Sequence, residues 1–356
     1  MTSLMERISE RARELHVPLN IHLNLTWKCN ERCVHCYEDH EAVAGDMSTA
    51  EVKHVLDQLA EAGALFLTIS GGEIMLRRDL MEIVAYARSL LFDVVLKTNG
   101  TMLRDQDAAE IARLGVRQVN ISIYSYNAEG HDAVTLLPGS FARSIEAIRR
   151  LKRHGVNVDM RTPLMESNGR DFPKIQALAA ELGVEVCFDP TIFPRTDGKL
   201  NGDVNPTSLR LHGEKLYQIL RDPRLVPTRE EFCAPPPSAG QHALTQFPCG
   251  AGRNHAHIGP DGAVTPCSLY PMHCGSLRES TFAEVWRSPA IERLQRTRKR
   301  DLPVCSTCPN VASCDPCAAL AYLEGDDRGA SLVDCEKTFA ITGIPSPLMV
   351  RNGLPA

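Results

Sequence analysis

The sequence predicts an α/β fold: a partial (β/α)6 barrel of the TIM type, followed by a small cysteine-rich domain. Between residues 20 and 190, short β-branched and aliphatic runs alternate with helical patterns, which is typical of βα units in a parallel sheet. We count six such units, fewer than the eight of a complete barrel, so we expect an open barrel. The last third of the chain is loop-rich and carries most of the 13 cysteines, as in small domains stabilised by metal.

The elements follow in order along the chain. Residues 1–19 form an expected amphipathic helical extension, because charged residues are interspersed among its apolar ones. Ser48 and Glu51 match a capping box that opens a helix, and later helices end at Gly115, Gly155 and Gly183. The expected strands are Asn20 to Thr26, Leu65 to Ser70, Asp93 to Thr98, Gln118 to Ser125, Val156 to Pro163 and Val184 to Asp189.

The domain boundary is expected near residue 225. Beyond Asp189 the pattern changes to turn-rich sequence, then a short helical stretch, and then a run of three prolines at residues 235–237. This gives three parts: the extension at 1–19, the barrel at 20–225 and the cysteine-rich domain at 226–356.

Composition excludes several classes of partner. A formal net charge of -5 provides no broad basic surface for nucleic acid. The N-terminus does not have the pattern of a signal peptide, and no apolar run reaches the length of a membrane span. We therefore expect a soluble cytoplasmic protein, in which cysteines bind metal or clusters more readily than they form disulfides.

Three cysteines directly follow the first expected strand, at the mouth where parallel α/β folds carry their active loops. Cys29, Cys33 and Cys36 can hold three corners of a 4Fe-4S cluster and leave the fourth iron open. The alternative is a zinc loop, whose fourth ligand would be His35 or a distant residue.

This C-x3-C-x2-C loop, with His35 before its last cysteine and Tyr37 after it, resembles that of the radical S-adenosylmethionine (SAM) superfamily. The resemblance implies that SAM chelates the open iron and that an electron from the cluster splits it to give a 5'-deoxyadenosyl radical. That radical would abstract a substrate hydrogen.

Further cofactor contacts are implied at the ends of later strands. By resemblance, the Gly71-Gly72-Glu73 motif holds the methionyl amine, Ser122 lies near the ribose and Arg161 lies near the methionyl carboxylate; Tyr37 and Asn99 are also assigned to the cofactor site. The alternatives are a common turn for the glycine motif, a strand-end salt bridge for Arg161 and local backbone hydrogen bonds for Ser122 and Asn99.

The C-terminal cysteines resemble a SPASM domain, which holds auxiliary clusters behind many radical SAM barrels. The resemblance implies two sets of ligands: a distal group of Cys305, Cys308, Cys314 and Cys335, and a proximal group of Cys249, Cys267 and Cys317. Cys233, Cys274 or an open position completes the proximal group. The sequence departs from the family pattern around Cys317, which leaves the number of clusters and a zinc-ribbon alternative open, whereas Cys187 is expected to be a buried structural thiol.

Relatives of this architecture often modify peptides, so we expect oxidative side-chain modification or crosslinking of a peptide or small protein. Electrons would come from a flavodoxin- or ferredoxin-type donor. The short N-terminal extension predicts a separate leader-binding protein. Ser268 replaces the aspartate of sulfatase-maturing relatives, which disfavours formylglycine formation. Tetrapyrrole side-chain modification is the alternative reaction, an iron-sulfur electron carrier is the non-enzymatic alternative, and no general base can be named.

Overall fold

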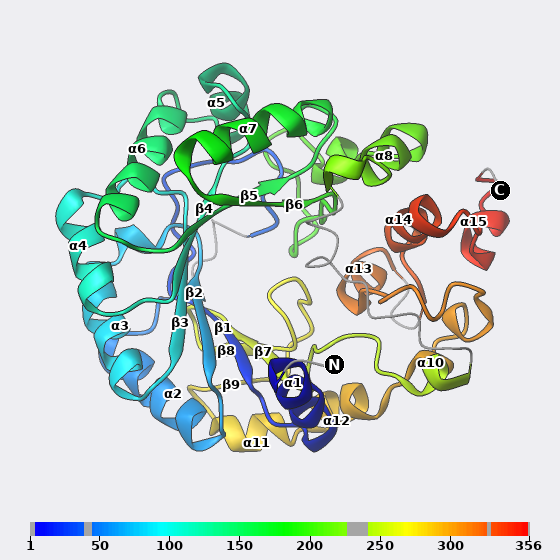
Figure 1. Ribbon diagram of the computed structural model, residues 1–356. Coiled ribbons are helices and arrows are strands. Elements are labelled where there is room, and N and C mark those ends of the chain that lie inside the picture. The colour runs from blue at the N-terminus through cyan, green and yellow to red at the C-terminus, as the bar shows by residue number, and fades with distance from the viewer. Residues whose placement is uncertain (1–3, 39–44, 226–240, 326–328, 355–356) are drawn as a thin grey trace.

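A curved, open sheet organises the molecule. The computed structural model describes residues 4–38, 45–225, 241–325 and 329–354. Its sheet has nine strands in the order β6-β5-β4-β3-β2-β1-β7-β8-β9, so β6 and β9 are the free edges and the barrel does not close. Helices α2 to α7 cover the convex face, and the C-terminal helices α13 to α15 lie on the opposite, open side (Figure 1).

Six parallel βα units form the barrel, as the sequence predicted. The strands are β1 Asn20–Asn24, β2 Phe66–Ser70, β3 Asp93–Thr98, β4 Gln118–Ser122, β5 Val158–Pro163 and β6 Glu185–Asp189. The helices are α1 Leu4–Leu15, α2 Thr49–Glu61, α3 Leu80–Ser89, α4 Asp105–Arg113, α5 Ala128–Thr135, α6 Ser140–Arg153, α7 Phe172–Leu182 and α8 Gly213–Leu220. Several strands are one to three residues shorter than expected, because the residues at their ends enter loops. The Ser48 capping box is present.

The two faces of the strands differ in chemistry. On β2 and β3, Leu67, Ile69, Val94 and Leu96 are buried against the helices in the main core. Because side chains alternate along a strand, the residues between them face the hollow inside the barrel, which we call the lumen. Several lumen residues are polar, including His22, Asn24 and Asn120, so the inner face is built to contact something other than a hydrophobic core.

The C-terminal part joins the same sheet. Strand β7 (His255–Ile258) pairs in parallel with β1, and β8 (Ala263–Thr265) and β9 (Gly275–Ser276) continue as antiparallel strands. The sequence analysis expected no strands here. The remaining helices are α10 Gln241–Thr245, α11 Phe282–Trp286, α12 Pro289–Arg296, α13 Ala318–Leu323, α14 Leu332–Thr342 and α15 Pro347–Arg351, with short 3-10 turns η3 Pro206–Leu209, η5 Lys299–Asp301 and η6 Cys305–Thr307.

Long apolar helices are absent from the described residues: none of these helices has the length and hydrophobicity needed to cross a membrane.

Candidate active site

The cysteine loop (residues 29–36) leaves the carboxyl end of β1 and is clamped to the end of β2. The amides of Gly72 and Glu73 donate to the carbonyls of Thr26 and Lys28, both at 2.8 Å. A Cβ on Gly71 would lie 2.4 Å from the Thr26 carbonyl oxygen, and one on Gly72 would lie 2.3 Å from that of Lys28. Both positions therefore need glycine, which explains the Gly-Gly pair by the close approach of these two loops.

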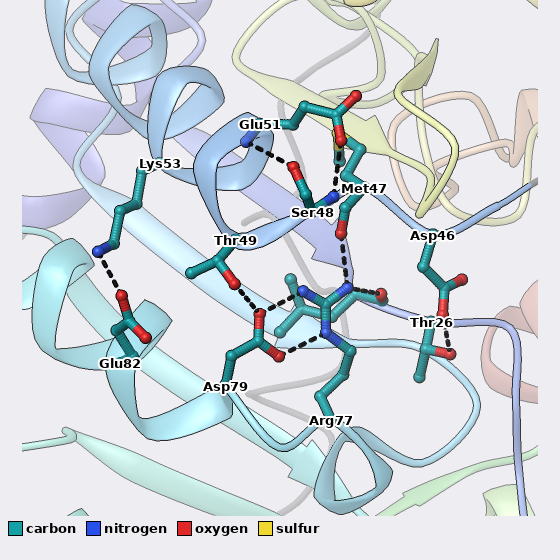
Figure 2. A network of polar contacts seen from close by, with 11 residues as sticks. Thr26, Asp46, Met47, Ser48, Thr49, Glu51, Lys53, Arg77, Asp79 and Glu82 are labelled. Atoms are coloured by element: carbon teal, nitrogen blue, oxygen red, sulfur yellow. Dashed lines mark hydrogen bonds and ion pairs between the residues drawn. The ribbon is translucent and has the colours of Figure 1, made fainter.

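A polar network fixes the other side of the same loop (Figure 2). The Arg77 guanidinium donates to the carbonyls of Leu25 and Met47 and forms an ion pair with Asp79 at 2.6 Å. Because this arginine is mostly buried and all its contacts are to fixed groups, the pair is better ordered than an exposed one. The end of β1, and with it the start of the cysteine loop, is held on two sides.

The three thiols of the loop are close enough to interact with one another. Burial, followed by the negative charges of Glu31 and of the other two thiols, raises the pKa of Cys33. Burial is also the largest cause that raises the pKa of Cys29 to about 11 and that of Cys36 to about 12. With raised pKa values these three thiols stay protonated unless a cation stabilises their thiolate forms, and an iron-sulfur cluster would supply that positive charge.

Glu31 lies inside the loop and was missed by the sequence analysis. Its side chain is 3% exposed, and Oε2 accepts a hydrogen bond from Cys33 Sγ at 3.3 Å, while Oε1 has no partner among the described residues. Burial raises the pKa of this carboxyl to about 7. A glutamate between two ligand-type cysteines is not distinguishable from a surface residue in the sequence, because only the fold buries it.

Glu73 is fully buried and bridges β2 to β3. Its carboxylate accepts hydrogen bonds from the Thr98 hydroxyl at 2.6 Å and from the amides of Asn99 and Met75 at 2.8 and 2.9 Å. Asn99 in turn donates to Asn30 of the cysteine loop at 2.9 Å. The ends of the first three strands thus form one hydrogen-bonded unit around the loop.

Side chains from later strands complete the surroundings of the loop. Tyr124 shares a hydrogen bond with Ser122, lies 3.9 Å from Cys33 Sγ through its hydroxyl, and contacts the His35 ring edge-on at 4.8 Å between centroids. Asn201 donates to the carbonyls of Val34 and Cys36 at 3.0 and 2.9 Å. The segment after β6, for which the sequence predicted only turns, therefore contacts the cysteine loop and holds its backbone in place.

Arg161 lies beside Ser122 in the register of β4 and β5. It forms an ion pair with Asp159 at 3.0 Å, the alternative that the sequence left open, yet its Nε is buried and has no partner among the described residues. One edge of the guanidinium is therefore available for a carboxylate.

Lys97, on the lumen face of β3, was not anticipated. It makes no hydrogen bond or ion pair with the residues that the structure describes, and burial, followed by the charge of Arg161, lowers its pKa. Its electrostatic neighbours include Cys267 of the C-terminal domain. The sequence did offer one indication of this residue: Lys97 is the only basic residue in the mostly apolar strand β3, and strand alternation places it on the lumen face.

Two histidines line the bottom of the lumen. His22 and His257 contact edge-on at 5.6 Å between ring centroids, and the Nε2 atom of each is buried without a partner in the described part of the chain. The Thr265 hydroxyl donates to the carbonyl of Cys267, so it accepts from Nδ1–H of His257 at 2.8 Å. Nε2 of His257 is then an unsatisfied acceptor that faces the lumen.

The distal group converges on one cavity. Cys305, Cys308, Cys314 and Cys335 all line it, together with Lys299 and Asp334. Burial is the largest cause of the raised pKa of each of these thiols, and neighbouring thiols contribute at Cys305, Cys314 and Cys335. Four thiols around one enclosed space match the four ligands of a closed 4Fe-4S cluster.

The proximal group lies nearer to the barrel. Cys317 interacts electrostatically with Cys249 and Cys267, and Cys267 with Cys249. The buried phenol of Tyr37 interacts with both Cys36 and Cys267 and hydrogen-bonds Ser268. Tyr37 therefore lies between the cysteine loop and the proximal group.

The other cysteines fall outside these groups. Cys274 is buried in the main core, and burial alone raises its pKa to about 11, with no neighbouring thiol contributing. Cys187 pairs with Arg161 in the register of β5 and β6, and its side chain is only partly buried. Cys233 lies outside the described residues.

The donor set fits iron-sulfur clusters. Within residues 4–38, 45–225, 241–325 and 329–354, no group of three or more histidine, cysteine, aspartate or glutamate side chains has the geometry to hold a metal ion. The ligands of a cubane are spaced around a larger inorganic core, so grouped thiols beside an enclosed cavity are what such a cluster requires.

Comparisons with known proteins agree with this geometry. The family model described as the radical SAM superfamily matches residues 23–179, and the SPASM model, described as an iron-sulfur cluster-binding domain, matches residues 249–309. The AdoMet-dependent heme synthase of Oleidesulfovibrio alaskensis is 30% identical over 84% of this chain and 82% of its own length. The subtilosin biosynthesis protein AlbA of Bacillus subtilis is 27% identical over 88% and 69%, respectively.

A solved structure shares the fold. SuiB of Streptococcus suis bound to S-adenosylmethionine superposes with a TM-score of 0.70 at 13% identity, covering 92% of this chain and 80% of that one. SuiB has also been solved bound to its precursor peptide SuiA. The chain belongs to the radical SAM superfamily and is an enzyme with a C-terminal SPASM domain, whose cofactors are S-adenosylmethionine and 4Fe-4S clusters.

Proposed function

We propose that this enzyme oxidatively modifies or crosslinks side chains of a peptide or small protein. The observation that carries the oxidative part is Tyr37, which lies between Cys36 of the loop and Cys267 of the proximal group. A substrate in the lumen is then next to both sets of thiols. When bound, SAM and its cluster would supply the radical chemistry that removes one hydrogen atom, and an auxiliary cluster would take up the electron that the substrate loses together with a proton to solvent.

The ligand sets follow from this proposal. Cys29, Cys33 and Cys36 hold the cluster that binds SAM, the distal group holds a closed auxiliary cluster, and the proximal group holds a second one, completed by Cys233 or left open. Cys274 is a poorer fourth ligand, because its thiol is buried in the main core without a neighbouring thiol.

The protein's own contacts to SAM follow from the strand ends. The backbone of Gly71 and Gly72, with the carboxylate of Glu73, is positioned for the methionyl amine, and the unpartnered edge of Arg161 is positioned for the carboxylate. Ser122 and Asn99 lie on the rim for the ribose and adenine. Glu73 already accepts three hydrogen bonds, so its larger contribution is to hold the glycine backbone in place.

The peptide assignment is supported by similar proteins. AlbA is named for bacteriocin biosynthesis, and SuiB binds a precursor peptide. We infer a separate leader-binding protein, a flavodoxin- or ferredoxin-type electron donor, and a reducing cytoplasmic location suited to thiolate ligands.

The test uses the reconstituted enzyme under anaerobic conditions with dithionite and SAM. Short peptides encoded beside its gene are added one at a time, with and without the neighbouring leader-binding candidates. A peptide that loses two mass units and stimulates formation of 5'-deoxyadenosine supports the proposal. If every such peptide is returned unchanged while 5'-deoxyadenosine still forms, the peptide assignment is wrong.

Tetrapyrrole side-chain modification is the second candidate, favoured by one observation. Lys97 faces the lumen, where its ammonium can bind a carboxylate of such a substrate, and three of the relatives are AdoMet-dependent heme synthases. Incubation with iron coproporphyrin III distinguishes the two: loss of carbon dioxide from its propionates supports this candidate, and an unchanged porphyrin excludes that reaction.

A further inference from the structure

A buried lysine lines the distal cavity. Lys299, the first residue of η5, is 1% exposed. Its ammonium donates to the carbonyl of Cys314 at 2.7 Å and to that of Val311 at 3.3 Å, and forms an ion pair with Asp315 at 2.9 Å. Fully buried lysines are rare, because desolvating an ammonium is costly unless nearby groups stabilise the charge. A neutral side chain of similar length could make the two carbonyl contacts, so the charge itself requires an explanation.

The two carboxylates near the cavity, those of Asp334 and Asp315, do not fully account for the buried charge of Lys299. Asp334 also lines it, but its carboxylate forms an ion pair with Lys337 at 2.9 Å and accepts a hydrogen bond from the amide of Cys317 at 2.8 Å. Asp315 is about one-third exposed and does not line the cavity, so water screens its charge more than that of Lys299. The charge of Asp334 raises the pKa of Cys305, Cys314 and Cys335, and among the described residues that line the cavity Lys299 is the one whose positive charge opposes it, at Cys305.

We propose that Lys299 is a positioning residue for the distal cluster, whose ammonium compensates the charge of the four thiolates and stabilises the reduced cluster. The inference rests on the ligand assignment proposed above. One-electron reduction adds a negative charge to a cluster that is already negative, and net charge and hydrogen bonding set its reduction potential. A fixed positive charge in a low-dielectric environment therefore raises that potential.

The test is a redox titration of the full chain followed by electron paramagnetic resonance. Cys29, Cys33 and Cys36 are replaced by alanine, so that only auxiliary clusters give signals, and Cys308→Ala identifies the signal of the distal cluster. In Lys299→Met we expect the ratio of reduced to oxidised cluster at the parent midpoint to fall about tenfold, a shift of about 59 mV for one electron. In Asp315→Asn we expect a shift of opposite sign, because the lysine loses its counter-charge.

Two controls separate charge from structure. Lys299→Arg keeps the charge and should keep the parent midpoint, and Arg300→Gln removes an exposed neighbouring charge and should not change it, because solvent screens that side chain. Opposite shifts in Lys299→Met and Asp315→Asn support the inference. No shift, or shifts of the same sign, overturns it.

Loss of the cluster is also informative. If Lys299→Met does not assemble the distal cluster, Lys299→Gln, which keeps a hydrogen-bond donor without the charge, is titrated in its place: a fall in midpoint supports the inference, and an unchanged or raised midpoint overturns it. If Cys308→Ala contains as much iron as its parent, the ligand assignment is wrong and this inference is overturned with it. A cluster that is present but insensitive to both charge variants contradicts only the role of Lys299.

Discussion

The cysteine loop and the distal group present the same kind of thiol in different numbers and surroundings. The loop offers three thiols from eight consecutive residues after the carboxyl end of β1, where glycine backbone and polar strand ends surround it. The distal group gathers four thiols from three separate segments around an enclosed cavity. An incomplete ligand set suits a cluster that must bind a cofactor, whereas a complete set suits electron transfer alone.

The largest expected effect comes from removing a thiol of the cysteine loop. Cys33→Ser should reduce the formation of 5'-deoxyadenosine to background, because the cluster that binds SAM loses a ligand. The nucleoside is measured by mass spectrometry after anaerobic reduction with SAM. Cys274→Ala, which removes a thiol from the apolar core, is the matched control and should retain SAM cleavage. An equal loss of SAM cleavage in both variants would contradict a specific role of Cys33 as a cluster ligand.

Removing a thiol of the distal group should affect product formation but not the cleavage of SAM. Cys308→Ala should lower iron by about four per chain but leave cleavage of SAM without substrate within a few-fold of the parent, since the open cluster is intact. Formation of oxidised product should be lost. Iron analysis and quantification of the nucleoside check this, and complete loss of SAM cleavage would show that the two regions are not independent.

The clamp behind the cysteine loop gives the third effect. Gly72→Ala places a methyl group against the Lys28 carbonyl, so we expect a loss of about 2 kcal/mol in the free energy of unfolding and incomplete assembly of the loop cluster. Gly45→Ala has nothing within 4 Å of the new Cβ and should change neither quantity. Thermal unfolding and visible absorption measure both, and a Gly72→Ala protein with full cluster content would contradict the clamp.

The smallest effect concerns the cofactor itself. Arg161→Lys keeps the positive charge but loses the planar, two-pronged contact, so we expect the KM for SAM to rise about tenfold while iron content stays unchanged. An unchanged KM would assign Arg161 to its ion pair with Asp159 alone.

Features that depend on only a few neighbouring residues could be predicted from the sequence. The six strands, the Ser48 cap and the glycine pair after β2 depend on alternation, capping and turn chemistry within a few residues, and these were predicted. The two groups of C-terminal cysteines were proposed from a family resemblance, and the fold brings together the members of each group.

The rest depends on contacts between distant segments. Glu31 resembles a surface residue in the sequence, and only the fold buries it. Lys97 also resembles a surface residue, and the electrostatic neighbours that distinguish it, Arg161 and Cys267, come from distant segments. Asn201 reaches the cysteine loop from a segment that shows only turn signals. Strands β7 to β9 are short, and their pairing with β1 is a tertiary event that local propensity does not report.

The pairing of β7 with β1 has a mechanical consequence. The cysteine loop follows β1, and Cys267 follows β8, which pairs with β7 and through it with β1, so backbone spacing within one hydrogen-bonded sheet fixes the separation of the two segments. A fragment that ended before β7 would leave β1 as an unpaired edge strand that is prone to self-association. It would also lack the strands that fix the position of Cys267 relative to the cysteine loop. The sheet therefore fixes the distance over which the proposed electron transfer between the two regions would take place.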